Sequence, residues 1–399
     1  APQSALAHSF LAAAIGHQGR LHEALDIHRR AAALEPDNVR AIMALGSALY
    51  ETGFAAEGLP LLERAAALAP QSWEAHFSLA VVKLALGDFA QGWREFLYRS
   101  TRGKFIRLYP DVKLSSALPA TLAGQHVCVQ REQGLGDQIF FLRFAHEIKA
   151  RGARITYRAT PKIASLLARV VAIDRVIPDT EPYPAADYTL LVSDLPLSLL
   201  SDDSSSGADK RGSPLVPPPL ALAPLPEQMV KMQTRLAQLG PPPYIGLTWR
   251  GGVAPEDQRG GAAWMLFKQI PLAQLGDALR GINGTFIALQ RNPAGGEIDQ
   301  LANLLGKPLH DFSALNEDLE AMLALLALID DYIGVSNTNM HLRAGTGKTA
   351  HVLVPCPSEW RWMAHGEESP WFPGFKVYRQ KSDGNWDSAL KKLSGDLLE

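Results

Sequence analysis

A period of 34 residues in the first hundred positions limits how this 399-residue chain can fold more than any other feature. Gly19, Gly53 and Gly87 are spaced by 34 residues, and so are Pro36 and Pro70. A unit that repeats at this length cannot bury its apolar face alone, so neighbouring units must stack. The alanine-rich segments between these positions predict a stack of helix pairs.

The repeated positions have physical roles. Each glycine lies where we expect a helix to end in a residue of left-handed conformation. Each proline lies where the next repeat opens, and there the missing backbone N–H costs little stability. Small residues such as Ala44, Ala48 and Ala80 allow helices to pack closely. Residues 1–105 resemble tetratricopeptide repeats, which usually bind a peptide or protein on a concave face. The alternative is that they only brace the neighbouring domain.

From about residue 120 strand-like runs alternate with helical patterns, which is typical of βαβ units and a parallel sheet. We expect strands at 126–130, 153–158, 187–192, 244–248, 284–289, 331–335 and 350–354. We expect helices at 137–150, 161–170, 226–239, 271–280, 295–305 and 316–329. A serine- and proline-rich stretch, 201–226, separates two α/β halves. The predicted domains are therefore 1–105, 106–225 and 226–399.

Composition narrows the class of protein. A net charge of -2 and a pI of about 6.7 do not fit a general nucleic-acid or membrane-surface binder. Cys128 and Cys356 lie far apart inside apolar runs, which predicts no disulfide framework or zinc site and fits a reducing compartment. No apolar stretch approaches the roughly 18 residues of a membrane span. We expect a cytoplasmic protein with no nucleic-acid partner.

A glycine-rich turn, 134–137, joins the apolar run 127–130 to an apolar helical stretch. In an open α/β sheet such a turn lies at the carboxyl ends of the strands, where ligands bind. Its glycines let another molecule approach the backbone, and the helix N-terminus offers free N–H groups. Asp137, which ends the turn, is either a helix cap or a catalytic base.

The second half has comparable loops. Strand 244–248 ends in Trp249 and Arg250, strand 284–289 ends in Gln290 and Arg291, and the basic residues Arg259 and Lys268 lie between these strands. Strand 331–335 is followed by Ser336, Asn337, Thr338 and Asn339, and then by His341. One such residue suffices to cap a helix, so four in a row favour phosphate binding at its N-terminus. His341 is expected to line or support the loop.

Several segments resemble glycosyltransferase family 9, the heptosyltransferase-like group, in the version that carries tetratricopeptide repeats. They are 133–137, 193–196, 245–249, 269–272, 336–345, 359–362 and 369–373, and they extend over roughly residues 120–390. The resemblance implies an N-terminal tetratricopeptide α-solenoid followed by a GT-B pair of Rossmann-like α/β domains. It also implies transfer of a sugar from a nucleotide-diphosphate sugar to an acceptor hydroxyl.

The resemblance further assigns roles to residues. Asp137 would be the general base, within an acceptor-side loop that includes Gln133, Gly134 and Gly136. The donor would be held by Trp249, Arg250, Lys268, Gln290, Arg291, Ser336, Asn337, Thr338, Asn339 and His341. With these groups stabilising the leaving diphosphate, no metal and no cofactor are expected. The acceptor is expected on a protein or glycan bound through the repeats.

Asn337 departs from this family. Many members have an aspartate before the threonine, and the amide keeps the hydrogen bonds but loses the charge. This change points to a different sugar or nucleotide, or to a weakened enzyme. Two other functional classes stay open: a tetratricopeptide scaffold whose glycosyltransferase-like domain only binds a ligand, and a nucleotide-sugar epimerase of GT-B shape.

The end of the repeat region is unusually aromatic. Phe89, Trp93, Phe96, Phe105 and Tyr109 lie within the segment 87–109. An exposed apolar surface of that size is unusual for a soluble monomer. We therefore expect this segment to pack against the first Rossmann-like half.

Overall fold

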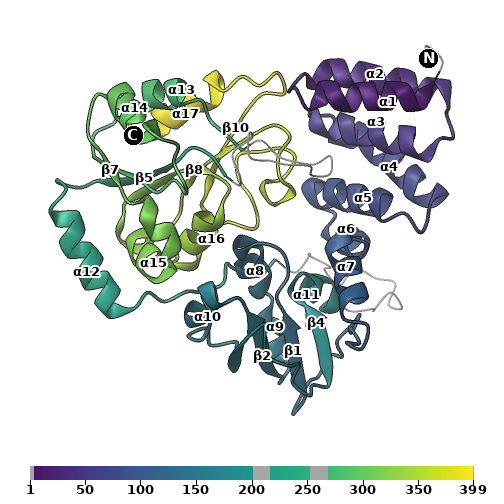
Figure 1. The fold of residues 1–399 in the computed structure, drawn as a ribbon, viewed down its shortest axis with the longest axis horizontal. Coiled ribbons are helices and arrows are strands. Elements are labelled where there is room, and N and C mark those ends of the chain that lie inside the picture. The colour runs from purple at the N-terminus through teal and green to yellow at the C-terminus, as the bar shows by residue number, and fades with distance from the viewer. Residues whose placement is uncertain (1–3, 201–215, 252–267, 399) are drawn as a thin grey trace, which may run out of the picture.

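A computed structural model describes residues 4–200, 216–251 and 268–398. The chain forms a helical region followed by two α/β units, each built on a parallel sheet (Figure 1). Arg259 and most of the predicted linker lie outside the described residues. Within the ranges just given, no helix is both long and apolar enough to cross a membrane.

The helical region confirms the 34-residue period. Its helices are α1 (Ala5–Gly16), α2 (Leu21–Leu34), α3 (Val39–Glu51), α4 (Ala55–Leu68), α5 (Trp73–Leu86), α6 (Phe89–Phe96) and α7 (Ser100–Leu108). The starts of α1, α3 and α5 are 34 residues apart, as are those of α2, α4 and α6. Gly19, Gly53 and Gly87 all have the expected positive φ, between 79° and 91°. That these helices are tetratricopeptide repeats stays a prediction.

The prolines lie in the turns where the next repeat opens, as expected, but not at the first position of a helix. Pro36 lies in the turn before α3 and Pro70 just after the end of α4, and the residues that cap the following helices are Asn38 and Ser72. The Asn38 and Ser72 side chains accept hydrogen bonds from backbone N–H groups in the first turns of α3 and α5. Capping side chains therefore set these helix starts, and the prolines only shape the turns.

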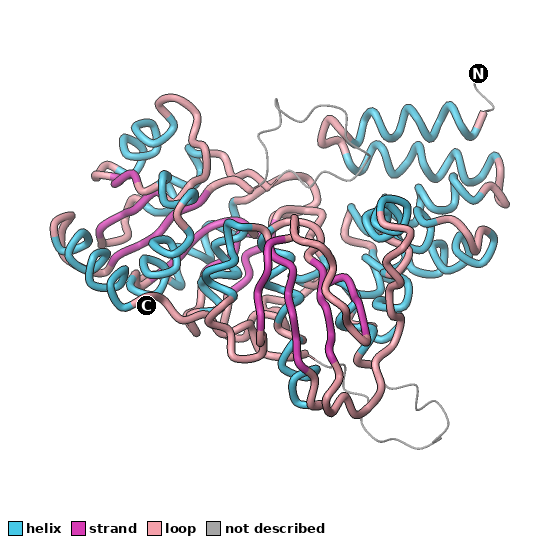
Figure 2. The backbone as a smooth tube through the Cα atoms, turned by 60° about the horizontal axis from the view of Figure 1, so that its bottom comes forward, coloured by secondary structure: helices cyan, strands magenta, loops and turns pink. Residues whose placement is uncertain are grey.

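The first sheet has the strand order β3-β2-β1-β4, and its strands lie side by side in Figure 2. Its elements are β1 (His126–Gln130), α8 (Leu135–Leu142), α9 (Ala145–Ala150), β2 (Arg154–Ala159), α10 (Pro161–Leu167), β3 (Arg175–Pro178), β4 (Tyr188–Leu191) and α11 (Leu195–Ser198). The strand order reverses between β1 and β4. In open parallel sheets ligands bind in the crevice at such a reversal, outside the carboxyl ends of the strands.

The second sheet has the order β10-β9-β8-β5-β6-β7, which reverses between β5 and β8. Its elements are α12 (Pro226–Ala237), β5 (Tyr244–Thr248), α13 (Leu272–Leu279), β6 (Thr285–Ala288), α14 (Glu297–Leu305), β7 (Leu309–Asp311), α15 (Leu319–Leu328), β8 (Asp331–Val335), α16 (Thr338–Gly345), β9 (His351–Val354), β10 (Lys376–Arg379) and α17 (Asp387–Asp396). The loops at this reversal are those that the sequence marked for donor binding.

The expected strands all form, and three of them have the predicted bounds. Three strands of the structure, β3, β7 and β10, were not predicted. They lie at the edges of the two sheets and have only three or four residues each. The predicted helix 137–150 begins earlier, at Leu135, and is interrupted at Arg143 and Phe144.

The aromatic end of the helical region packs against both α/β units. Phe89, Trp93 and Phe96 are buried. The Trp93 ring lies 6.0 Å from Phe141 of the first unit and 5.3 Å from Trp360 of the second, between ring centroids. The expected contact with the first unit is confirmed, and the second unit takes part as well.

Phe105 and Tyr109 differ from that expectation. Phe105 is only partly buried, and Tyr109 is exposed. Both rings lie beside Tyr183, at 6.4 and 6.0 Å. The buried aromatic contact is thus made by α6, while Phe105 of α7 and the following Tyr109 form a surface cluster with Tyr183.

Replacing Trp93 by alanine should strongly destabilise the protein, because the ring fills the junction of all three parts. Truncation of a buried tryptophan typically costs about 3–5 kcal/mol. Trp73→Ala is the matched control, since Trp73 lies in the same region and is 42% exposed. Equal losses in melting temperature for the two variants would contradict the packing described here.

Candidate functional site

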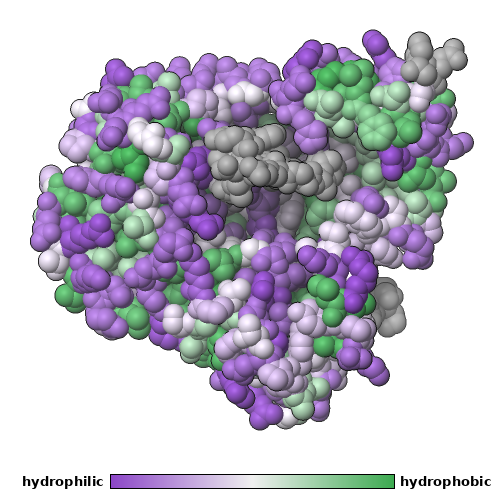
Figure 3. Space-filling view, viewed as in Figure 1, coloured by the Kyte–Doolittle hydropathy of each residue, from purple (hydrophilic) through white to green (hydrophobic). Residues whose placement is uncertain are grey.

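The crevices of the two sheets face each other across the contact of α8 with α16. Gly136 makes this contact possible, because a Cβ atom there would lie 2.9 Å from His341 Cδ2 and 3.5 Å from Thr338 Cα. The glycine-rich turn of the first unit and the polar loop of the second therefore meet directly. The surface is hollowed where the three parts come together (Figure 3).

The backbone of the glycine-rich turn places Asp137 at this junction. Gln133 has a left-handed φ of 62°, and Gly134 is the N-cap of α8. Asp137 Oδ2 accepts a hydrogen bond from the Gly134 N–H at 3.1 Å. Asp137 is therefore not the N-cap of α8, but from the third helical position one of its carboxylate oxygens caps the Gly134 N–H, which leaves the other oxygen available for another role.

That second oxygen contacts the C-terminal unit. Arg361 donates to Asp137 Oδ1 at 2.5 Å and also pairs with Glu359. Its guanidinium carbon lies 4.6 Å from the centre of the Phe140 ring and 4.4 Å from that of Trp360. The flanking aromatic rings shield the Arg361 guanidinium from water, whereas Asp137 stays partly exposed.

Glu359 extends this contact to Lys268 and Ser336. It accepts from Lys268 Nζ at 2.6 Å and from Ser336 Oγ at 3.1 Å. Burial raises its pKa, but the charges of Lys268 and Arg361 outweigh burial and hold the pKa well below the usual range. Asp137, Arg361, Glu359, Lys268 and Ser336 form one ionic network, as we call it below, which crosses from one unit to the other.

The loop before α16 is ordered by Asn337. Its side-chain oxygen accepts from the N–H groups of Asn339 and Met340 at 3.0 and 3.3 Å, and its amide donates to Thr248 Oγ1 at 3.0 Å. Asn337 is therefore the cap of α16, and phosphate binding by this loop stays a prediction. Thr338 is partly buried and begins the helix beside Gly136.

His341 lies behind this loop rather than in an open site. Its ring is buried and packs 5.3 Å from Phe372, and burial lowers its pKa well below the usual range. His341 Nδ1 and Arg361 Nε are buried with no hydrogen-bond partner among the described residues. Buried polar atoms in proteins are usually hydrogen-bonded, so these two atoms have unused hydrogen-bonding capacity.

The other donor-side candidates divide into two groups. Gln290 Oε1 accepts from the backbone N–H groups of Trp249 and Arg250 at 3.0 Å, so it holds the loop after β5. Arg250 pairs with Glu297 at 2.9 Å. Burial alone would raise the pKa of Glu297, but the contact with Arg250 outweighs burial, so the pKa is lowered. Arg291 is 66% exposed and lies outside the ionic network.

Sequence reasoning did not identify Glu359 and Arg361 as site residues. They occurred only within a segment that resembled the family. A usable signal was present, because two opposite charges alternate with two tryptophans in residues 359–362. Charged residues in such an apolar setting are buried and must therefore be paired.

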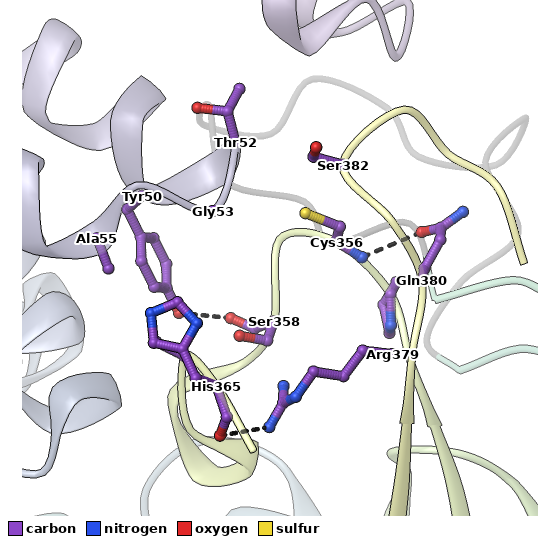
Figure 4. A pocket seen from close by; sticks show the side chains of 12 residues that line it. Tyr50, Thr52, Gly53, Ala55, Cys356, Ser358, His365, Arg379, Gln380 and Ser382 are labelled. Carbon is purple, nitrogen blue, oxygen red and sulfur yellow. Dashed lines mark hydrogen bonds between the residues drawn. The ribbon is translucent and has the colours of Figure 1, made fainter. Parts of the chain in front are cut away.

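A pocket of about 160 Å³ lies between the helical region and the ends of β9 and β10, next to the segment 359–362 (Figure 4). Tyr50 donates to the Ser358 carbonyl at 2.5 Å, and Cys356 Sγ donates to the Glu51 carbonyl at 3.2 Å. Ala364 N–H donates to the Ala85 carbonyl at 2.8 Å. The helical region thus holds the segment that carries Glu359 and Arg361 at three points.

No family model matches the sequence. The chain is 25% identical over 350 residues to Protein FlbA of Caulobacter vibrioides, over 81% of this chain and 54% of that protein. It therefore spans about half the length of this curated relative.

Within the described residues, no group of three or more His, Cys, Asp or Glu could hold a metal ion.

Solved structures with a similar shape include a glycosyl transferase family 9 protein from Veillonella parvula, with 12% identity, a TM-score of 0.49, and coverage of 71% of this chain and 99% of that one. The E. coli ADP-heptose lps heptosyltransferase II has 14% identity and a TM-score of 0.45, over 68% and 98%. An O-GlcNAc transferase from Thermobaculum terrenum has 15% identity and a TM-score of 0.31, over 99% and 91%.

Glu51, whose carbonyl accepts from Cys356, should make stability depend on pH. Burial raises its pKa to about 7, so between its unfolded value and pH 7 the folded chain keeps a proton that the unfolded chain releases. Stability is therefore lost as the pH rises through this window. Glu51→Gln should recover about 1–3 kcal/mol at pH 8 and nothing at pH 4. Thermal unfolding at both pH values measures this, with the exposed Glu57→Gln as control. A gain that is equal at both pH values would contradict the assignment.

Proposed function

We propose that this chain is a glycosyltransferase that moves a sugar from a nucleotide-diphosphate sugar to an acceptor hydroxyl, with Asp137 as general base. The observation that carries the proposal is the meeting of the two crevices, which joins Asp137 to Lys268 and Ser336 through the ionic network. Ligands of open parallel sheets bind at such crevices. The sequence resemblance to glycosyltransferase family 9 covers the same loops.

On the acceptor side, Asp137 has the contacts that a positioned base requires. Its two oxygens accept from Gly134 and Arg361, and a carboxylate has further lone pairs to accept a hydroxyl proton. Its side chain is 26% exposed, so an acceptor can reach it. As Asp137 takes the proton, the acceptor oxygen bonds to the anomeric carbon and the bond to the diphosphate breaks.

On the donor side, the negative charge that develops on the leaving diphosphate needs positive charge and oriented N–H groups. Lys268 lies in the ionic network, 2.6 Å from Glu359, and the N-terminus of α16 begins at Thr338 beside Gly136. A diphosphate at this place would share Lys268 with Glu359. Arg250 would act from its ion pair with Glu297.

The helical region supports a macromolecular acceptor, a protein or a glycan. Under this proposal residues 1–105 are tetratricopeptide repeats, 106–225 the acceptor half and 226–399 the donor half. The helical region packs on both halves through the Trp93 cluster. An acceptor bound to the repeats would therefore be held at a defined distance from Asp137.

Replacing Asp137 by asparagine should abolish transfer and leave donor affinity unchanged, because loss of a general base typically costs about 10²–10⁴-fold. A thermal-shift screen against nucleotide-diphosphate sugars first identifies the donor, and product analysis with and without acceptor then measures turnover. Asp174→Asn is a matched control, since Asp174 pairs with Lys149 and lies at the amino ends of the strands, directly before β3.

Each result of this experiment has one meaning. Activity of Asp137→Asn within a few-fold of the parent would remove Asp137 as base. Donor binding without any turnover would favour the scaffold function. Conversion of the donor sugar to an isomer without acceptor would identify an epimerase.

Lys268→Ala should weaken nucleoside diphosphate binding by roughly 1–3 kcal/mol if Lys268 contacts phosphate. Arg280→Ala provides the control, because Arg280 is 60% exposed, pairs with Asp277 and is not a predicted donor-site residue. Titration calorimetry with the nucleoside diphosphate compares them. Unchanged affinity in Lys268→Ala would remove Lys268 from the site and direct attention to Arg250 and Arg291.

A further inference from the structure

A cation from the helical region occupies the crevice of the first sheet. Arg99, between α6 and α7, contacts the loop after β1 through Glu132 and the loop after β4 through Asp194. The Arg99–Glu132 contacts measure 2.9, 3.1 and 2.6 Å, and the Arg99–Asp194 contact measures 2.7 Å. These two loops form the crevice where the strand order reverses.

The three charges are withdrawn from water. Side-chain exposures are 2% for Arg99, 7% for Glu132 and 3% for Asp194. Two buried carboxylates on neighbouring loops repel each other unless a cation lies between them. The planar guanidinium fork contacts both at once, which a lysine ammonium cannot reproduce. The distance between the two loops is therefore set by a residue of the helical region.

Glu132 connects this contact to the proposed base. It directly precedes Gln133, whose φ is 62°, and Gly134, which caps α8 and donates to Asp137. A left-handed backbone at a non-glycine residue persists only where its surroundings hold it. The Arg99–Glu132 pair supplies such a hold at the residue next to Gln133.

We propose that Arg99 is a positioning residue: acting through Glu132, it sets the glycine-rich turn so that Asp137 reaches the acceptor hydroxyl. This inference rests on the proposed function of Asp137. It makes the helical region a part of the acceptor crevice, in addition to any part it has in recruiting the acceptor. Arg99 itself touches neither substrate.

The test compares Arg99→Lys and Arg99→Met with Lys83→Met in the full chain. Lys83 is a matched control, because it is a buried cation whose partners, Glu63 and Asp88, both belong to the helical region. Displacing a catalytic group by about 1 Å can cost around 100-fold in rate. We expect kcat to fall by roughly 10–100-fold in Arg99→Met, less in Arg99→Lys, and not in Lys83→Met, with an unchanged KM for the donor in all three.

Hydrogen exchange of the amides of residues 131–142 provides a readout that needs no activity. These amides should lose protection in Arg99→Met and Arg99→Lys while the helical region keeps its own, and they should stay protected in Lys83→Met. A parent-like turn in a folded Arg99→Lys, or an equal loss in Lys83→Met, would overturn the proposal. If the parent turns over no nucleotide sugar, the proposed function fails, whereas the exchange result still decides whether Arg99 holds the turn.

Discussion

Two guanidinium groups removed from water hold the three parts of this chain in their relative positions. Arg99 joins the helical region to both loops of the first crevice, and Arg361 joins the second α/β unit to Asp137. A buried charge that loses its partner carries the full cost of desolvation. The parts therefore cannot separate without exposing these charges or leaving them unpaired, which ties the geometry of the site to the packing of all three.

The apolar surroundings make these pairs strong. The rings of Trp93, Phe141 and Trp360 come from the helical region, the first unit and the second unit, and they meet at the same junction. They exclude water from the neighbouring ion pairs, and electrostatic interactions strengthen as the local dielectric falls. Aromatic packing and charge pairing thus act at one place, next to the turn that carries Asp137.

Much of the architecture followed from local patterns. The strands β1, β5 and β8 are apolar runs bounded by turn residues, and each was predicted with its observed bounds. The short edge strands β3, β7 and β10 were not, because three or four residues carry too little periodic signal. The loops that contain Asp137, Lys268 and Ser336 were recognised from their residue types. The roles of Glu359, Arg361 and Arg99 required their partners to be known.

The sequence by itself determined the 34-residue period, the central strands and the chemistry of the loops that follow them, because each depends on residues close together in the chain. Only the tertiary structure decided which charges pair. Arg99 lies 33 positions from Glu132 and 95 from Asp194, and Arg361 lies 224 positions from Asp137. Such contacts form when separate sheets and helices pack together. Which charged residues pair is therefore set by their distance in the folded structure, and a local sequence pattern does not contain this information.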